Sequence, residues 1–182
     1  LSYIGIFSGS LILFTYILGV LNNFFYKKFI NKGSAVAHIG LGLLFLAVSL
    51  NSILSYEKNL NLALGESIFV NESIKEFSFD DIKVLKASNH DVISVEVSLL
   101  QDGKNIFLNP QKRKYATRGQ ITTESSIYAS ILKDTYLTIG DQLDNGSWTF
   151  ALKINYFIKW IWFSASLMVM GMLITIFKKK AI

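Results

Sequence analysis

The chain has 182 residues, of which 51% are hydrophobic and only 17% are charged, a composition too apolar for one soluble domain. It contains no cysteine, which excludes disulfides, thiolate metal sites and thiol chemistry by its own side chains. The net charge of +5 at pH 7 comes from lysines beside apolar segments, so it does not indicate a nucleic-acid-binding face.

Three stretches without any charged residue account for the apolar excess: Tyr3–Leu21, Val36–Leu54 and Ile161–Phe177. Each is close to the roughly 17–25 residues that a helix needs to cross a bilayer. The first stretch lacks the basic start and the small-residue cleavage site of a signal peptide. We therefore predict three transmembrane helices.

The charged residues are sorted along the chain. All 13 acidic residues fall between Glu57 and Asp144, whereas the lysines of Lys27–Lys32 and Lys178–Lys180 lie beside the apolar stretches. Short loops rich in lysine stay on the cytoplasmic side of a membrane, or on the matrix side in a mitochondrion. We predict that residues 55–157 face the opposite, extracytoplasmic compartment.

Lys159, Trp160 and Trp162 lie at the start of the third apolar stretch. Tryptophan is enriched where a helix meets the lipid headgroups, and a lysine at a helix end extends its ammonium toward them. This pattern predicts the outer end of the third helix.

Residues 55–157 have the length of one domain and a mostly β pattern. Alternating or β-branched runs predict strands, and Asp102-Gly103 predicts a tight hairpin. The predicted strands are Ile68–Glu72, Phe77–Ala87, Val92–Gln101, Lys104–Asn109 and Trp148–Ile154. A short helix is predicted within Thr123–Tyr136, with Thr122 or Thr123 as its cap near Glu124.

The predicted fold class is an α+β membrane protein, in which a β-rich extracytoplasmic sandwich or open barrel is inserted between the second and third transmembrane helices. Residues 1–54 form two helices with a basic inner loop, residues 55–157 form the β-rich domain, and residues 158–182 form the last helix with a basic inner tail.

Two polar features of the β-rich domain are candidates for function. The stretch Pro110–Gln120 holds the cations Lys112, Arg113, Lys114 and Arg118. It is either a solvated basic loop or a site for carboxylates, such as haem propionates or an acidic partner, because guanidinium groups bind carboxylates in a bidentate manner. The other candidate is His90, which we interpret as a histidine in an exposed turn.

His38 is the ionisable residue of the second apolar stretch, and such a residue at membrane depth is costly and often functional. Helical spacing places Ser34, Ala35, Gly42 and Phe45 on its face. The small residues leave room for either a closely packed helix or a flat macrocycle, with Phe45 against the macrocycle's rim. The histidine either packs or snorkels as a neutral side chain, or ligates haem iron while the Ser34 carbonyl or hydroxyl holds its other nitrogen.

Four motifs occur in an order that resembles a known family. They are AHIGLGLLFLAVSLNSILSYEKNLNLALGES, NPQKRKYATRGQITTESSI, LKDTYLTIGD and FIKWIWFSASLMVMGMLITIF. Together they resemble the C-terminal third of the CcmF family, the cytochrome c haem lyases of the Ccm maturation pathway. The resemblance runs from about Ala37 to Phe177, which is most of the chain.

The resemblance implies a function in cytochrome c maturation. Members of the family take haem from the chaperone CcmE and attach it to apocytochrome c, which thiol-reducing and presenting partners deliver. They also carry a structural b-type haem between two transmembrane histidines, thought to reduce the iron of the incoming haem. His38 stands at the second of these positions, which makes it the expected axial ligand of haem b. The implied location is a bacterial or mitochondrial inner membrane, crossed several times.

This chain also departs from the family pattern. The tryptophan-rich segment that presents haem, the other transmembrane histidine and the two outward-facing histidines have no counterpart in it. We therefore expect a fragment or one subunit of a split protein, which is part of a haem lyase, carries no catalytic residue and works with the remainder of CcmF. The alternative is a membrane-anchored extracytoplasmic interaction module without a cofactor. A third interpretation, a cytochrome b-like electron-transfer subunit, is disfavoured by the single membrane histidine.

Overall fold

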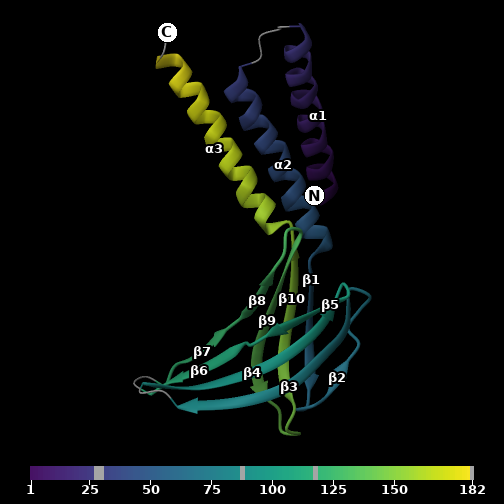
Figure 1. Cartoon of the computed structure of the whole chain (residues 1–182), viewed down its shortest axis with the longest axis vertical. Helices are drawn as coiled ribbons and strands as arrows, with labels where there is room; N and C mark the ends of the chain where they lie inside the picture. Colours follow the sequence, from purple (N-terminus) through teal and green to yellow (C-terminus); the bar gives the residue numbers. More distant parts are fainter. Residues whose placement is uncertain (27–30, 87–88, 117–118, 181–182) are drawn as a thin grey trace. The chain divides into compact units, whose positions relative to one another are not determined.

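The structure, a computed structural model, describes residues 1–26, 31–86, 89–116 and 119–180. The chain divides into two compact units (Figure 1). One unit contains Leu1–Ser55, Ile131–Lys133 and Asn155–Ile182, and the other contains Tyr56–Ser130 and Asp134–Ile154. The first unit is helical and the second is a β-sandwich, and each is described by itself.

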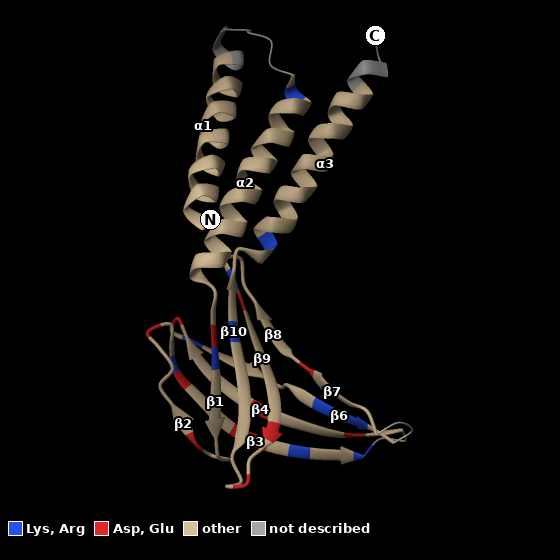
Figure 2. Ribbon diagram, turned by 180° about the vertical axis from the view of Figure 1, so that it is seen from behind, with Lys and Arg blue, Asp and Glu red and all other residues tan. Residues whose placement is uncertain are grey.

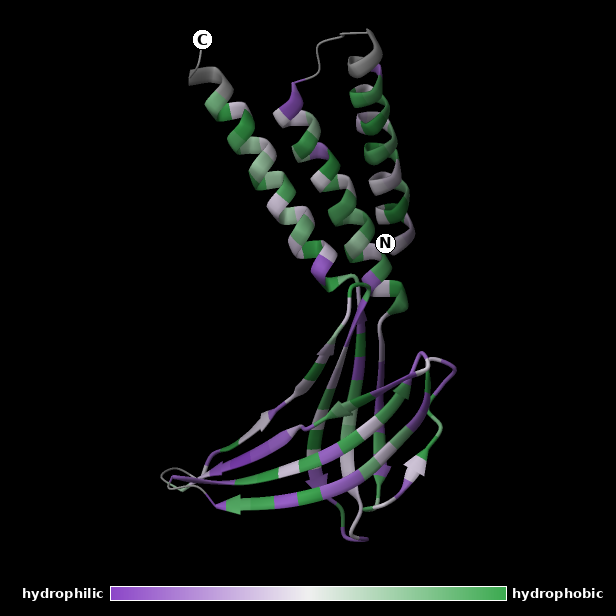
Figure 3. Ribbon diagram, in the orientation of Figure 1, coloured by the Kyte–Doolittle hydropathy of each residue, from purple (hydrophilic) through white to green (hydrophobic). Residues whose placement is uncertain are grey.

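Three helices make up most of the first unit: α1 (Ser2–Tyr26), α2 (Lys32–Leu54) and α3 (Ile158–Lys180). All three are long and apolar enough to cross a membrane, and their hydrophobic colouring continues along most of their length (Figure 3). The three predicted helices are thus confirmed. Of the basic loop, Lys27 and Lys28 lie outside the described residues, and Lys32 is the first residue of α2.

The start of α2 is fixed by Asn31, whose side-chain oxygen accepts a hydrogen bond from the Gly33 backbone N–H at 3.1 Å. Asparagine is among the strongest N-cap residues because it satisfies a backbone donor that has no partner inside the helix. The cap therefore sets where α2 begins, at Lys32, three residues before Ala35 and six before His38.

Helix α2 lies between α1 and α3 and contacts both (Figure 1). A Cβ atom at Gly171 of α3 would lie 2.5 Å from the Gly33 carbonyl oxygen and 2.4 Å from the Ala37 nitrogen. On the other side, a Cβ atom at Gly42 would lie 3.0 Å from the Gly9 carbonyl oxygen of α1. Glycines at these positions let the backbones approach, which is how transmembrane helices commonly pack.

The described residues of the sandwich form ten strands. Three residues of these strands, Lys133, Asn155 and Tyr156, belong to the helical unit. The strands are β1 (Tyr56–Leu62), β2 (Ser67–Ile68), β3 (Ile74–Lys86), β4 (His90–Gln101), β5 (Lys104–Leu108), β6 (Gln111–Tyr115), β7 (Ile121–Glu124), β8 (Ser126–Ala129), β9 (Lys133–Gln142) and β10 (Trp148–Tyr156). One sheet has the order β1-β10-β9-β8, and the other β2-β3-β4-β6-β7 with β5 also paired to β4.

The predicted hairpin at Asp102-Gly103 is confirmed. Gln101 of β4 pairs with Lys104 of β5, and the two turn residues have φ angles of 49° and 74°. Positive φ at both central positions is the geometry of a type I′ turn, which asparagine or aspartate followed by glycine favours.

The helix predicted within Thr123–Tyr136 is wrong. This segment forms β7, β8 and the start of β9. Thr122 and Thr123 do not cap a helix but pair with Arg113 and Lys112 of β6. The chain then passes from one sheet to the other at Ser125, since β7 and β8 belong to different sheets. Threonine, isoleucine and tyrosine favour strands where a partner strand is available.

The strand predicted at Ile68–Glu72 is also wrong for most of its length, because β2 ends at Ile68. The chain turns instead at Asn71, whose side-chain oxygen accepts hydrogen bonds from the backbone N–H groups of Ser73 and Ile74 at 2.9 and 2.8 Å. This local bond replaces strand pairing, as asparagine side chains commonly do at turns.

The core of the sandwich lies between its two sheets. Phe150 of β10 contacts both Phe77 and Phe79 of β3, edge to face, at ring-centroid distances of 5.6 and 5.1 Å. A buried hydrogen bond of 3.0 Å from the Thr135 hydroxyl to the Gln101 side-chain oxygen also joins the two sheets. Because the chain has no disulfide, these contacts between the sheets carry the stability of the sandwich.

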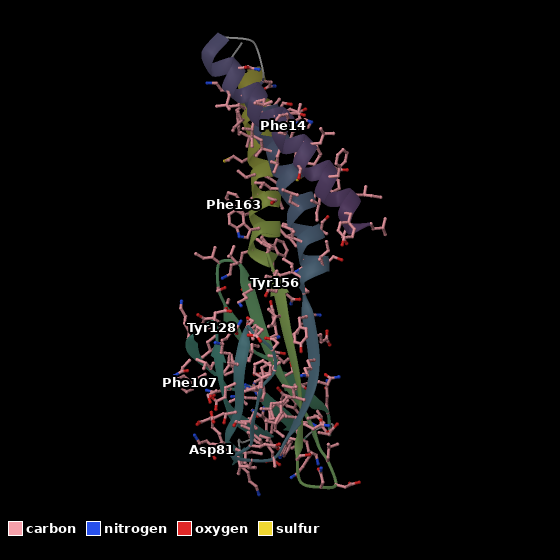
Figure 4. All side chains as sticks on the ribbon, turned by 90° about the vertical axis from the view of Figure 1, so that its right-hand side faces the viewer. Phe14, Asp81, Phe107, Tyr128, Tyr156 and Phe163 are labelled. Carbon is pink, nitrogen blue, oxygen red and sulfur yellow. The ribbon has the colours of Figure 1, made fainter. Side chains whose placement is uncertain are left out.

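We predict that Phe150→Ala lowers the free energy of unfolding of the sandwich by about 3–5 kcal/mol, because a fully buried ring is lost. Phe150 is 1% exposed, whereas Phe107 is 74% exposed. Figure 4 shows Phe107 at the outside of the sandwich. The matched control Phe107→Ala should change the free energy of unfolding by no more than about 0.5 kcal/mol. Urea unfolding of the chain in detergent, followed by the β-sheet circular dichroism signal, measures both. Equal effects of the two substitutions would contradict the assigned core.

Candidate functional site

The candidate site in the helical unit is centred on His38, in the second turn of α2. Its Nδ1 atom lies 2.7 Å from the Ser34 backbone carbonyl oxygen and 3.4 Å from the Ser34 hydroxyl. A carbonyl oxygen only accepts hydrogen bonds, so Nδ1 carries the proton and donates it. When the ring is neutral, its lone pair is therefore on Nε2, which has no hydrogen-bond partner among the described residues.

The imidazole ring of His38 is also held from the side by α1. Tyr16 stacks on it with a ring-centroid distance of 4.3 Å and an angle of 16° between the ring planes. The sequence did not reveal this partner, because it depends on the relative rotation and height of two helices. Stacking fixes the plane of the imidazole ring, but it does not fix the direction in which Nε2 points within that plane.

The interpretation that Gly42 leaves room for a macrocycle is wrong. The space at Gly42 is filled by α1, since a Cβ atom there would lie 2.8 Å from Cγ of Leu13. Ala35 is completely buried, whereas Phe45 is exposed. The small residues on this face therefore serve helix packing, which is the other interpretation that the sequence allowed.

A histidine that ligates haem iron needs a neutral ring, one free nitrogen and an acceptor for the other nitrogen. His38 meets the last two requirements, with the Ser34 carbonyl as the acceptor and Nε2 as the nitrogen without a partner among the described residues. Among the residues that the structure describes, no group of three or more histidine, cysteine, aspartate or glutamate side chains is placed to hold a metal ion. The residues present thus fit one axial position of a haem, whose second ligand would come from elsewhere.

The basic stretch Pro110–Gln120 is not a solvated loop, because its first half forms β6 (Figure 2). The Arg113 guanidinium forms an ion pair with Glu124 of β7 at 2.7 Å and donates a hydrogen bond to Gln111 at 3.0 Å. The Lys112 ammonium pairs with Asp141 of the other sheet. Arg118 lies outside the described residues.

These ion pairs change what the basic stretch offers to a ligand. Arg113 and Lys112 are each neutralised by a carboxylate of the sandwich itself, so they hold strands and sheets together. On the same sheet, Lys83 of β3 and Glu96 of β4 form a similar surface pair. The hydrogen bond and the charge of Glu96 raise the pKa of Lys83 above its ordinary value.

An open cavity of about 340 Å³ lies within the sandwich. Its lining is mixed: apolar Val84, Ile93, Ile121 and Trp148, polar Gln142, the cations Lys112 and Lys114, and the acids Asp91 and Asp141. Cations and acids are equal in number here, so the cavity offers no excess of positive charge to haem propionates.

His90 is the first residue of β4, next to the connection from β3. It is half-buried rather than exposed. Its Nδ1 atom lies 2.5 Å from the Asn89 side-chain oxygen, and its ring centroid lies 5.2 Å from that of Tyr115 on β6. These contacts assign it a local structural role in the sandwich.

Comparison with known proteins gives consistent similarities. The family profile described as CcmF C-terminal beta-sandwich matches residues 53–156. The cytochrome c-type biogenesis protein CcmF of Escherichia coli K12 is 30% identical over 80% of this chain and 22% of its own length. CcmF of Pseudomonas fluorescens is 34% identical over 74% of this chain and 20% of its own length.

The probable cytochrome c-type biogenesis protein NrfE of Escherichia coli K12 is 27% identical over 86% of this chain and 28% of its own length. A solved structure of cytochrome c heme lyase CcmF has the same fold, with a TM-score of 0.63 and 15% identity, over 78% of this chain and 24% of that one. The chain spans about a fifth of the length of the CcmF relatives that it matches.

We predict that Arg113 and Glu124 are coupled in stability. Reversing either charge places two like charges on adjacent strands and should lower the free energy of unfolding, whereas the double swap R113E/E124R should restore most of it. The coupling expected for a partly exposed pair is about 0.2–1 kcal/mol. A double-mutant cycle from urea unfolding measures it. If the effects of the two reversals on the free energy of unfolding simply add, Arg113 and Glu124 are not coupled. Arg113 would then be available to a carboxylate of a ligand.

Proposed function

Because this chain belongs to the CcmF family, which it matches over residues 53–156, we propose that it works in cytochrome c maturation as the C-terminal part of a haem lyase. Relatives that it matches are named cytochrome c-type biogenesis proteins, and the similar solved structure is a cytochrome c heme lyase. The chain covers about a fifth of those biogenesis proteins. Attachment of haem to apocytochrome c would therefore be carried out by the longer protein, to which this chain contributes.

Within that protein, the proposed role of His38 is to provide one axial ligand of a structural b-type haem. The observation that carries this proposal is the 2.7 Å contact between Nδ1 and the Ser34 carbonyl oxygen, which leaves the Nε2 lone pair free. Iron is bound by neutral imidazole, and the hydrogen bond at the other nitrogen sets the tautomer and raises the basicity of the ligand.

The chain's own residues would hold the ligand rather than perform a reaction. Ser34 fixes the proton on Nδ1, and Tyr16 fixes the plane of the ring. A haem bound there would supply a one-electron carrier within the membrane. The remaining partners in the proposal are the rest of CcmF, the haem chaperone CcmE, and apocytochrome c with the proteins that reduce and present it.

The proposed location is a bacterial or mitochondrial inner membrane, with residues 55–157 in the extracytoplasmic compartment. Its support is the clustering of lysines in Lys27–Lys32 and Lys178–Lys180, since short lysine-rich segments stay on the inner side of a membrane. The proposed division is then residues 1–54 and 158–182 for the membrane part and residues 55–157 for the exported domain.

One observation favours the alternative, a membrane-anchored interaction module without a cofactor. The stacking of Tyr16 on His38 would also stabilise a histidine that does nothing more than join α1 to α2. In the first function Nε2 of His38 binds haem iron, and in the alternative it binds no metal. Substitution of His38 distinguishes the two functions.

We predict that His38→Ala, in the full-length protein, weakens or abolishes the reduced α-band of the haem and lowers cytochrome c attachment. His38→Gly with added imidazole should recover part of the spectrum, because free imidazole can occupy the vacated position. His90→Ala is the matched control and should leave the spectrum unchanged, since His90 lies in the sandwich. An unchanged bis-imidazole spectrum in the His38→Ala protein would mean that another residue ligates the haem, and the proposed role of His38 would be refuted.

We predict that a cysteine at Lys104 reacts with a membrane-impermeant maleimide added from the extracytoplasmic side. Lys104 is exposed in the sandwich, and unlike its neighbour Gly103 it has no positive φ that a side chain would strain. The natural absence of cysteine makes the signal specific. A cysteine at Lys32, at the start of α2, should react only after the inner side is opened. The reverse pattern would overturn the proposed topology.

A further inference from the structure

The turn between β8 and β9 exposes two consecutive large apolar residues. Ile131 is 74% exposed and Leu132 is 53% exposed. In other connections of the sandwich, exposed large apolar residues such as Leu64 and Phe69 occur singly. Contiguous apolar surface on a protein commonly marks a contact with a partner or a membrane.

This apolar turn belongs to the helical unit and is tied to the start of α3. The Trp160 indole N–H donates a hydrogen bond to the Ile131 carbonyl oxygen at 3.1 Å. The Phe157 backbone N–H donates another to the Leu132 carbonyl oxygen at 2.8 Å. The two bonds hold the turn at the height of the first turn of α3, with both apolar side chains outward.

The side chains around the turn are those of a membrane–water boundary. Ile131, Lys159, Trp160 and Phe163 line an open cleft of about 220 Å³. Phe163 lies on the side of α3 near its start (Figure 4), and the Trp160 and Phe163 rings meet edge to face at 5.9 Å. Tryptophan and lysine are the residues that anchor a helix end at the headgroup layer.

We propose that the Ile131–Leu132 turn is a second membrane contact, which inserts its two apolar side chains into the headgroup and upper acyl region of the bilayer beside α3. The inference rests on the proposed topology, in which α3 spans the membrane. If α3 crosses with Trp160 at the boundary, the hydrogen bonds bring Ile131 and Leu132 to the same depth. Apolar side chains that enter an interface are buried there to about 5–10 Å.

Phospholipid is favoured as the occupant because the apolar turn is continuous with the outer surface of α3. Only 11% of the α3 span is buried within the structure, so most of its sides are left to lipid or to other protein. The cleft combines apolar walls with the Lys159 ammonium, which matches the acyl and phosphate layers of a lipid. Trp160 then acts as a positioning residue, because its indole N–H holds the turn.

The test uses single cysteines labelled with an environment-sensitive fluorophore, in the full chain reconstituted in phosphatidylcholine vesicles. The positions are Ile131, Met170 within α3 as the deep reference, and Leu143 in the β9–β10 turn as the aqueous reference. Vesicles carry a nitroxide either near the headgroup or near the end of the acyl chain. The label at Ile131 should be quenched more strongly by the shallow nitroxide, the label at Met170 by the deep one, and the label at Leu143 by neither.

The outcomes separate the two proposals. If Met170 is quenched by the deep nitroxide but Ile131 behaves like Leu143, then α3 spans the bilayer and the membrane contact of the turn is refuted. That outcome would favour a protein partner as the occupant of the turn. If Met170 is not quenched, the spanning topology fails and the turn proposal fails with it.

A second measurement tests the role of Trp160. Trp160→Phe keeps an aromatic ring but removes the hydrogen-bond donor to Ile131, so the shallow quenching of the label at Ile131 should fall. Trp162→Phe is the matched control, since the structure gives the Trp162 ring no bond to the turn. Equal quenching in the two variants would overturn the positioning role.

Discussion

The close approach of α2 to both neighbouring helices is the contact on which the helical unit depends. Gly42 meets the backbone of α1 at Gly9, and Gly33 meets the backbone of α3 at Gly171. In a bilayer, helix association gains little from the hydrophobic effect, so packing of close backbones has to supply it. The same contacts orient α2, and with it His38, toward Tyr16 of α1.

Much of the fold could be predicted because its signals are local. Charge-free runs of about twenty residues indicate membrane helices, and Asp102-Gly103 indicates a hairpin, whatever the rest of the chain does. The helix prediction for Thr123–Tyr136 was wrong because the structure of this segment depends on pairing with another strand and not on local signals alone. A threonine followed closely by a glutamate suits a helix cap as well as a strand, and pairing with β6 decides between them.

The candidate site, too, could be predicted only where its signals are local. His38 was identified because an ionisable residue in an apolar helix is costly by itself, and Ser34 followed from helical spacing. The partners of the cations could not be predicted, because they depend on the strand register: Glu124 reaches Arg113 across β6 and β7, and Asp141 reaches Lys112 across the two sheets. When the strand register is unknown, a basic stretch therefore suggests an open site for an anion. In the folded protein the same cations form ion pairs with carboxylates of the sandwich.

The packing of α2 also limits how His38 could serve a haem. Gly33 and Gly42 are filled by the backbones of α3 and α1, so α2's small residues leave no space for a porphyrin between the three helices. Phe45, on the same helix, is exposed, and the Nε2 atom of His38 has no partner in the described part of the chain. A macrocycle on His38 would therefore need walls and a second ligand from beyond these helices. That requirement agrees with a chain that spans about a fifth of its relatives.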